Sequence, residues 1–197
     1  MPRVERQGRL QRPADFTGAR LETFAQVWWR HGLPGAALAV LLLCLPQMHP
    51  LLAGSGARLL PLWPIYAIGA VCIATLLGLY ATLIQRRPAR SSLLWIGYLL
   101  CLSIWEEWAF RLALPSLGVA IGLQYWAAVV ASNVAFGAVH FFTLRWRWQW
   151  CVGAAIGGLL LSRHFHTHQE FMTIATLHWV GTFLNTPSPP GAGRVCR

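Results

Sequence analysis

Charged residues are scarce in this sequence, and lysine is absent. Charged side chains account for 11% of the 197 residues, compared with about 25% in an average soluble domain. Hydrophobic side chains account for 56%, which is more than a single soluble core of this length can bury. The composition therefore excludes an ordinary soluble globular protein and predicts a membrane protein.

Acidic residues are the scarcest charged type. The chain has six of them against 16 basic residues, all arginine, for a formal net charge of +10. Arginine also gathers in the cytoplasmic loops of membrane proteins, so this excess does not require a nucleic-acid partner, and we expect none. The acidic residues are Glu5, Asp15, Glu22, Glu106, Glu107 and Glu170.

Several familiar catalytic signatures are also missing. The sequence has no glycine-rich phosphate loop, no serine nucleophile elbow and no convincing internal repeat. Its five cysteines lack Cys-x-x-Cys spacing, which argues against a zinc ribbon or a disulfide framework. Any chemistry has to come from other residues.

Long charge-free stretches are abundant, and each is a candidate membrane span. A helix needs about 20 apolar residues to cross a hydrocarbon core of about 30 Å. Two stretches are shorter, but one can continue through Glu106 and Glu107 and the other can begin at interfacial tryptophans. The predicted fold class is all-α: a polytopic membrane helix bundle with about six transmembrane helices. The charge-free stretches are 31–57, 59–85, 91–105, 112–144, 148–162 and 171–193.

The distribution of arginine predicts the topology. Arginines are frequent before the first span, after the second and after the fourth, and infrequent in the loops between. This pattern predicts that both termini are cytoplasmic. We expect an integral protein of a bacterial cytoplasmic membrane. Its predicted parts are an Arg-rich cytoplasmic arm at 1–30, a transmembrane helical domain at 31–186 with a motif-bearing core at about 90–186, and a flexible tail at 187–197.

The most unusual feature is the pair Glu106 and Glu107. They lie among apolar residues in a predicted span, where a carboxylate is costly to insert and therefore suggests a functional site. Arg111 follows Glu107 by one helical turn and can form an i,i+4 ion pair with it. Two interpretations are open at this point: a functional site, or a structural pair at the membrane edge with Glu106 facing water.

Two histidines lie deep in other predicted spans. His140 is in the fourth span and His178 in the sixth, both among apolar residues. A single histidine on an apolar helix is more often a packing residue than a catalyst. Together with a carboxylate pair, however, two histidines can form an acid and a base matched to neutral pH. We therefore expect three helices to direct these side chains into one cavity.

The depths of these residues predict a break in the chain. If the third span begins at the cytoplasmic face near residue 92, Glu106 lies about 21 Å across the membrane, at a depth compatible with that of His178. His140 reaches this depth only if residues 114–125 form a surface turn or a short interfacial helix. The fourth span should then begin near Trp126.

A second candidate constellation is the histidine-rich segment from Arg163 to Glu170. Its alternating histidines, His164, His166 and His168, are candidate metal ligands if the segment is extended, since imidazole and carboxylate suit zinc or copper. The alternative is a solvated or interfacial loop on the non-cytoplasmic side, and we favour it.

Three short motifs resemble those of one family of membrane proteins. Residues Glu106 to Arg111 have the pattern EExxxR, Phe136 to His140 have the pattern FxxxH, and His178 stands where a third motif begins. Their order and spacing are similar to those of the CPBP family (CAAX protease and bacteriocin-processing, or Abi) of intramembrane proteases. The resemblance covers roughly the C-terminal half of the chain.

The resemblance implies peptide-bond hydrolysis inside the membrane, on a membrane-anchored or prenylated peptide or protein. It implies that Glu106 is the general base that activates a water, with Glu107 as its neighbour or alternate. His140 and His178 would orient the water and stabilise the oxyanion in a water-poor cavity, and Arg111 would hold the glutamate helix. A metal-free glutamic enzyme and a zinc enzyme are both open, and the first fits two histidines and a carboxylate pair better.

One position departs from the family pattern. The third motif usually has Asn or Asp four residues after its histidine, and here that position is Thr182. Thr182 can donate a hydrogen bond in its place, Asn185, nearly two turns after His178, can serve a wider cavity, or the site is degenerate. Asn133 stands seven residues before His140, and we expect it to form an interhelical hydrogen bond.

Two functions from different classes follow. The first is an intramembrane endopeptidase, and the second is a non-catalytic membrane scaffold or transport-related protein that retains the polar motif for helix association. We expect the first, with no required cofactor, zinc being the alternative. The lipid bilayer and a membrane-anchored substrate would be its partners. Supporting roles are expected for Arg111, Phe136, Thr182 and Asn185.

Overall fold

The computed structural model describes residues 10–12 and 21–190, and this part of the chain is all-α, as predicted. Most of the predicted arm, at 1–9 and 13–20, and the end of the predicted tail, at 191–197, lie outside the described residues. The helices are α1 Phe24–Val27, α2 Leu33–Leu43, α3 His49–Leu79, α4 Ala89–Glu107, α5 Leu114–Ala120, α6 Tyr125–Thr143, α7 Trp148–His168 and α8 Phe171–Asn185.

Wide π-helical turns join two pairs of helices without a break. Trp28–Gly32 connects α1 to α2, and Trp108–Ala113 connects α4 to α5. Each turn is followed by a proline, Pro34 or Pro115, which supplies no backbone N–H to the turn before it. Such turns are frequent at functional sites, and the second begins directly after Glu107.

The break between the first two helical segments does not lie at Arg58, where the charge-free stretches predicted it. The first helical segment ends with α2 at Leu43, and α3 begins at His49. The break falls here because the residue before a proline is disfavoured in a helix, and Leu45, which precedes Pro46, is extended with φ −77° and ψ 127°. Arg58, expected in a loop, is therefore inside α3.

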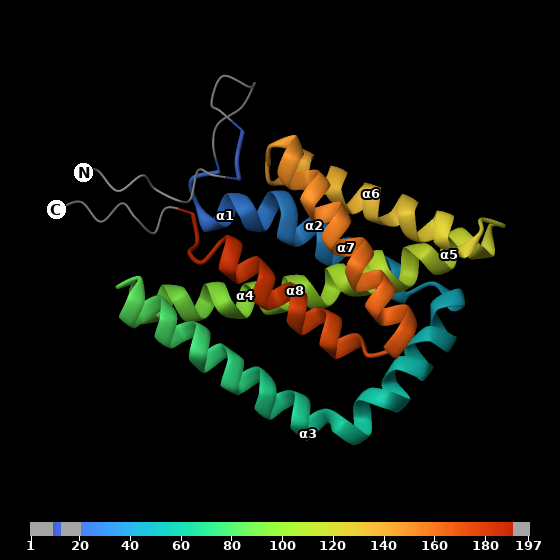
Figure 1. The fold of residues 1–197 in the computed structure, drawn as a ribbon, viewed down its shortest axis with the longest axis horizontal. Helices are drawn as coiled ribbons and strands as arrows, with labels where there is room; N and C mark the ends of the chain where they lie inside the picture. Colours follow the sequence, from blue (N-terminus) through green and yellow to red (C-terminus); the bar gives the residue numbers. More distant parts are fainter. Residues whose placement is uncertain (1–9, 13–20, 191–197) are drawn as a thin grey trace.

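Helix α3 is bent near its middle (Figure 1). Pro61 and Pro64 lie inside it, and a proline within a helix removes a hydrogen bond and produces a kink. The bent helix lies against α4 and α8. Its outer apolar side chains, such as Val71 and Leu76, are exposed, which is typical of a surface that faces lipid.

Three helical segments are long and apolar enough to cross a membrane, by length and composition: Pro46–Ile84, Ala89–Ala120 and Tyr125–Thr143. These segments identify an integral membrane protein, as the composition predicts. Helices α7 and α8 have 21 and 15 residues. The total of about six spans and the cytoplasmic location of the termini stay predictions.

The break before the fourth span has the predicted position but not the predicted form. Helix α6 begins at Tyr125, next to the expected Trp126. Residues 114–120, part of the stretch expected in a surface turn or short interfacial helix, instead continue the preceding helix as α5. The helix tolerates the missing N–H of Pro115 because Phe110 O, five residues earlier in the wide turn, accepts from Ser132 Oγ at 2.7 Å instead. The turn is confined to 121–124, where Gly122 has a φ of 96°, a conformation that glycine adopts without strain.

Helix α7 extends further than the sequence predicts. The histidine-rich segment, expected as a loop, is helical as far as His168. Its polar side chains are accommodated on the helix surface, and the hydroxyl of Thr167 donates to Arg163 O at 3.1 Å. The helix ends at Gln169, whose φ of 59° is left-handed.

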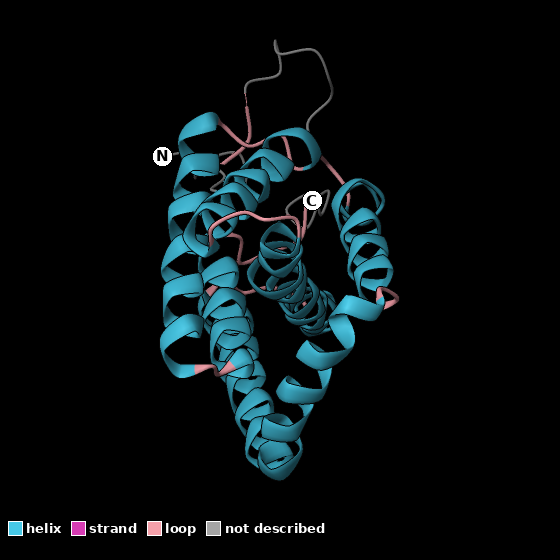
Figure 2. Ribbon diagram, turned by 90° about the vertical axis from the view of Figure 1, so that its right-hand side faces the viewer, coloured by secondary structure: helices cyan, strands magenta, loops and turns pink. Residues whose placement is uncertain are grey.

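Helix α4 lies within the bundle, with α8 beside it (Figures 1 and 2). Trp179 of α8 is buried and donates from Nε1 to Ile96 O at 3.0 Å. Trp95 contacts Phe24 at a ring centroid distance of 5.9 Å and donates from Nε1 to Thr186 O at 2.7 Å. The first helical segment therefore begins at the same end of the bundle at which the last one finishes.

Candidate active site

Five side chains from four parts of the fold form a buried acid–histidine cluster. We use this name for Glu106 and Glu107 of α4, His140 of α6, His178 of α8 and His31 of the turn between α1 and α2. The two carboxylates are 3% and 0% exposed, and His178, the most exposed member, is 12% exposed. Four predicted residues thus lie together on three helices, and His31 is an addition that the sequence did not predict.

Glu107 is held from two sides. Its Oε1 accepts a hydrogen bond from His178 Nδ1 at 2.6 Å, and its Oε2 lies 3.2 Å from Arg111 Nε in the predicted i,i+4 pair. The Arg111 guanidinium also lies over the Phe136 ring, with 4.1 Å between Cζ and the ring centroid. The buried carboxylate is therefore paired and hydrogen-bonded, which offsets its removal from water.

Glu106 lies between two histidines. Its Oε1 is 2.9 Å from His31 Nε2, and its Oε2 is 3.6 Å from His178 Nε2. The interpretation in which Glu106 faces water is wrong, because the residue is only 3% exposed. His178 contacts both carboxylates, through one ring nitrogen each, and so links the acidic pair.

His140 approaches the cluster from α6. Its Nδ1 donates to Phe136 O at 2.8 Å, so the hydrogen of a neutral ring is on Nδ1 and Nε2 is an acceptor. The ring packs on Phe136, Trp146 and His31 with centroid distances of 4.5, 4.6 and 5.0 Å. Phe136 therefore contacts both His140 and the guanidinium of Arg111.

His31 is the member that sequence reasoning missed. No motif surrounds it, and it lies far from the three motifs in the sequence. The only available signal is its place in a charge-free stretch, where a histidine has few polar partners on its own helix. Its partners come from α4 and α6, which the local sequence does not reveal.

Thr182 and Asn185 are the candidate replacements for the Asn or Asp that the third motif usually has. Asn185 is exposed, and its Nδ2 donates to Gly181 O at 2.9 Å within its own helix. Thr182 is partly buried, and within the described ranges no hydrogen bond joins its side chain to the cluster. Asn133 donates to Ser162 Oγ of α7 at 3.0 Å, which is the expected interhelical bond.

Gly158 of α7 makes room for the side chain of Arg111. A Cβ at this glycine would lie 2.8 Å from Arg111 Nη2 and would also overlap Asn133 Oδ1. We expect Gly158→Ala to destabilise the protein by about 1–3 kcal/mol, because overpacking a buried site displaces its neighbours. The measurement is the midpoint of thermal unfolding in detergent. Gly157→Ala is the matched control, since nothing lies within 4 Å of that Cβ, and an equal loss in both variants would contradict the prediction.

The histidine-rich segment does not bring its three histidines together. Because the segment is helical, His164 and His168 face each other with 4.5 Å between ring centroids, whereas His166 packs on Tyr125 and Trp126 at 4.9 and 5.2 Å. The expected loop is therefore wrong in form, and its candidate metal ligands are separated onto different faces of α7.

Among the described residues, one group of three donors is close enough to hold a metal ion. His31, Glu106 and His140 are buried, and their donor atoms all lie within 4.8 Å of one another. Two imidazoles and one carboxylate are a donor set of catalytic zinc sites, so these residues fit a zinc ion. The cluster therefore offers a donor set for the zinc alternative, whereas the histidine-rich segment does not bring its three histidines together.

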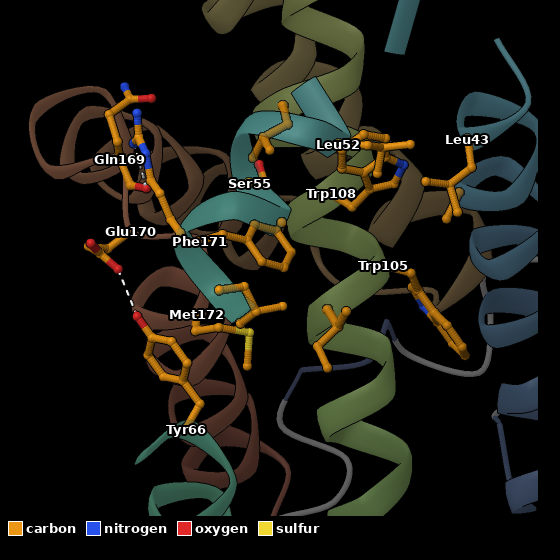
Figure 3. A pocket seen from close by; sticks show the side chains of 16 residues that line it. Leu43, Leu52, Ser55, Tyr66, Trp105, Trp108, Gln169, Glu170, Phe171 and Met172 are labelled. Atoms are coloured by element: carbon orange, nitrogen blue, oxygen red, sulfur yellow. Dashed lines mark hydrogen bonds between the residues drawn. The ribbon is translucent and has the colours of Figure 1, made fainter. Parts of the chain in front are cut away.

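A separate cavity of about 310 Å³ lies between α2, α3, α4 and α8 (Figure 3). Trp105 of α4 and Trp108 of the wide turn that follows it form part of its largely apolar wall. At its polar end, Tyr66 Oη donates to Glu170 Oε2 at 2.9 Å. No member of the cluster lines this cavity. The two tryptophans therefore face the cavity, whereas the carboxylates of α4 face the cluster.

Comparisons with known proteins match the segment that carries most of the cluster. The family model described as Type II CAAX prenyl endopeptidase Rce1-like matches residues 88–184. This range contains every member of the cluster except His31. No curated protein and no solved structure matches the chain. The chain belongs to the Rce1-like family of type II CAAX prenyl endopeptidases, a family of peptidases, as its motifs predicted.

Proposed function

We propose that this protein is an intramembrane endopeptidase that hydrolyses a peptide bond of a membrane-associated protein or peptide, with a water activated by Glu106. The observation that carries the proposal is the contact of His178 with both carboxylates, at 2.6 Å to Glu107 and 3.6 Å to Glu106. This contact joins a base to a histidine in a nearly water-free site, where charges and hydrogen bonds act more strongly than in water.

Glu106 is the general base in this proposal. A carboxylate can take a proton from a water within hydrogen-bond distance, and Oε2 is the oxygen on the side of His178. The oxygen of that water then forms a bond to the peptide carbonyl carbon, and the carbonyl becomes an oxyanion. When the peptide C–N bond breaks, the proton held by Glu106 passes to the leaving amine.

His140 and His178 are proposed to hold the water, whose hydrogens their Nε2 atoms can accept, and a proton on Nε2 would let them stabilise the oxyanion as well. His178 is oriented by Glu107, which is itself held by Arg111. Fixed partners of this kind keep a ring in position, so little reorganisation is needed when charge develops. The exposed edge of His178 is the proposed entry for substrate, since the other cluster members are at most 4% exposed.

We further propose that the substrate carries an apolar membrane anchor, such as a prenyl group.

We propose about six spans in a bacterial cytoplasmic membrane, with both termini in the cytoplasm. The contacts of Trp95 with Phe24 and Thr186 support termini on one side, and the arginine-rich loops support the cytoplasm as that side.

The proposed reaction uses no metal, and imidazole nitrogens lie beside both oxygens of Glu106 in its place. A zinc ion bound by His31, Glu106 and His140 would supply a Lewis acid and an activated water. With zinc bound in this way, Glu106 and His140 would be its ligands instead of the base and the group that positions the water, and metal removal separates the two cases.

Cleavage by the purified protein in lipid vesicles tests the proposed function. The wild type, incubated with a farnesylated CAAX peptide and with an unprenylated membrane-anchored peptide in isotopically labelled water, is expected to release a fragment whose new carboxylate carries one labelled oxygen. We expect a chelator to leave the rate unchanged. The readout is the mass of the products over time.

His140→Ala is the control for contaminating proteases and is expected to be at least about 100-fold slower, because it loses a group that positions the water or the oxyanion. Equal cleavage by folded wild type and folded His140→Ala would contradict the proposal. That outcome would favour the non-catalytic scaffold or transport-related protein, for which the Thr182 departure is the supporting observation. Loss of activity in chelator, with recovery on adding zinc, would contradict the metal-free reaction and the roles given to Glu106 and His140, but not the peptidase activity.

A further inference from the structure

We infer that His31 is a positioning residue for the reaction, which holds the carboxylate of Glu106 from a helical segment outside the family-matched range. The inference rests on the proposed function, because it adds a residue to the same site. It starts from the 2.9 Å contact between His31 Nε2 and Glu106 Oε1, two atoms in side chains that are 2% and 3% exposed.

The hydrogen bonds of Thr143 determine how His31 donates. The Thr143 hydroxyl donates to Val139 O at 2.7 Å, so its oxygen accepts from His31 Nδ1 at 2.8 Å. Nδ1 therefore carries a hydrogen. With Nδ1 bonded to Thr143 of α6, Nε2 is the ring nitrogen that faces Glu106 Oε1, so α6 fixes the direction from which His31 approaches the carboxylate.

The backbone around His31 is fixed to the helices that carry the rest of the cluster. The guanidinium of Arg30 donates to Phe142 O at 3.1 Å and to Thr143 O at 3.2 Å, at the C-terminal end of α6, where carbonyls lack helical partners. On the other side, a Cβ at Gly32 would lie 3.0 Å from Tyr98 Oη of α4. The wide turn is thus held between α6 and α4.

This arrangement assigns different tasks to the two oxygens of Glu106. His31 occupies Oε1, so Oε2 is the oxygen that meets the water. Misplacing a catalytic group by about 1 Å can lower a rate by about 100-fold. Loss of His31 should therefore lower kcat, whereas substrate binding should change little because His31 is 2% exposed and the proposed entry for substrate is at His178, which is 12% exposed.

Steady-state cleavage by full-length variants in vesicles tests the inference. His31→Ala is expected to lower kcat by about 10- to 100-fold with KM within about twofold of the wild type. His31→Gln, whose amide can still donate to Oε1, is expected to recover part of the loss. Thr143→Val, which removes the acceptor for Nδ1, is expected to give a smaller decrease. His49→Ala is the matched control, because His49 is an exposed histidine at the start of α3, and it should keep the wild-type kcat.

Two results would overturn the inference. One is an unchanged kcat in folded His31→Ala while the wild type cleaves and Glu106→Gln does not, which would leave the proposed function standing. The other is one zinc per protein in the wild type that is lost in His31→Ala, which would make His31 a metal ligand. His31→Leu fills the same space without a donor and carries the same test if the alanine variant does not fold. An inactive wild type is the separate outcome that contradicts the proposed function and the inference with it.

Discussion

Glu106→Gln is expected to lower kcat for peptide cleavage by at least about 1,000-fold, because a neutral amide cannot take a proton from water. The substitution keeps the size and shape of the side chain. It also retains a hydrogen-bonding oxygen near His31 and His178, the two partners at 2.9 and 3.6 Å. The expected loss is therefore chemical, with little change in folding. Product release in vesicles and the midpoint of thermal unfolding measure the two effects separately.

Glu170→Gln is the matched control for this prediction. It makes the same chemical change at a partly buried acid that bonds Tyr66 at the separate cavity, and it should leave the kcat of cleavage near the wild-type value. Retention of more than about a tenth of the activity by Glu106→Gln would contradict the assignment of the base. If Glu107→Gln were then inactive in a folded protein, the base would be Glu107.

Arg111→Met is expected to destabilise the protein by about 3–5 kcal/mol, because it leaves a buried carboxylate without its cationic partner. Glu107 is 0% exposed and lies 3.2 Å from Arg111 Nε. The hydrogen bond from His178 remains but does not replace a permanent charge. Unfolding in detergent, followed by helical circular dichroism, measures the loss, and a low yield of folded protein is expected as well.

A second substitution should reverse much of this effect. In Glu107→Gln/Arg111→Met the buried charge is removed together with its partner, and replacing a whole buried pair is often close to neutral. Arg163→Met, at an exposed arginine of α7, is the control for general loss of charge and should change stability little. A double variant no more stable than Arg111→Met would refute the idea that Arg111 acts by compensating Glu107.

The sequence predicted correctly those parts of the site that depend on a short distance along the chain or on a recognised motif. The pair between Glu107 and Arg111 follows from helical periodicity alone. The approach of Glu106, His140 and His178 was expected from their scarcity among apolar residues and from the resemblance of the three motifs. His31 could not be found this way, because its partners Glu106 and Thr143 are contributed by tertiary packing and no local pattern announces them.

The errors in the predicted fold have local physical causes. Charge was used to place loops, and it placed one at residues 163–170 although polar residues on the surface of α7 continue the helix to His168. The depth of His140 suggested a turn or separate helix at 114–125, but the preceding helix continues past Pro115, since Ser132 donates to the carbonyl of Phe110 in its place. Conversely, the break at Leu45 falls within an uncharged stretch, so the distribution of charge does not indicate a boundary there.

The acid–histidine cluster takes His31 from the first helical segment of the described chain and His178 from the last. Chains fold from the N-terminal side as they are synthesised, so α8 is the last of these helices to join α4. Until it does, Glu107 lacks the 2.6 Å hydrogen bond from His178. The proposed active site is therefore complete only after the last described helix has packed, so its assembly reports on the folding of the whole described bundle.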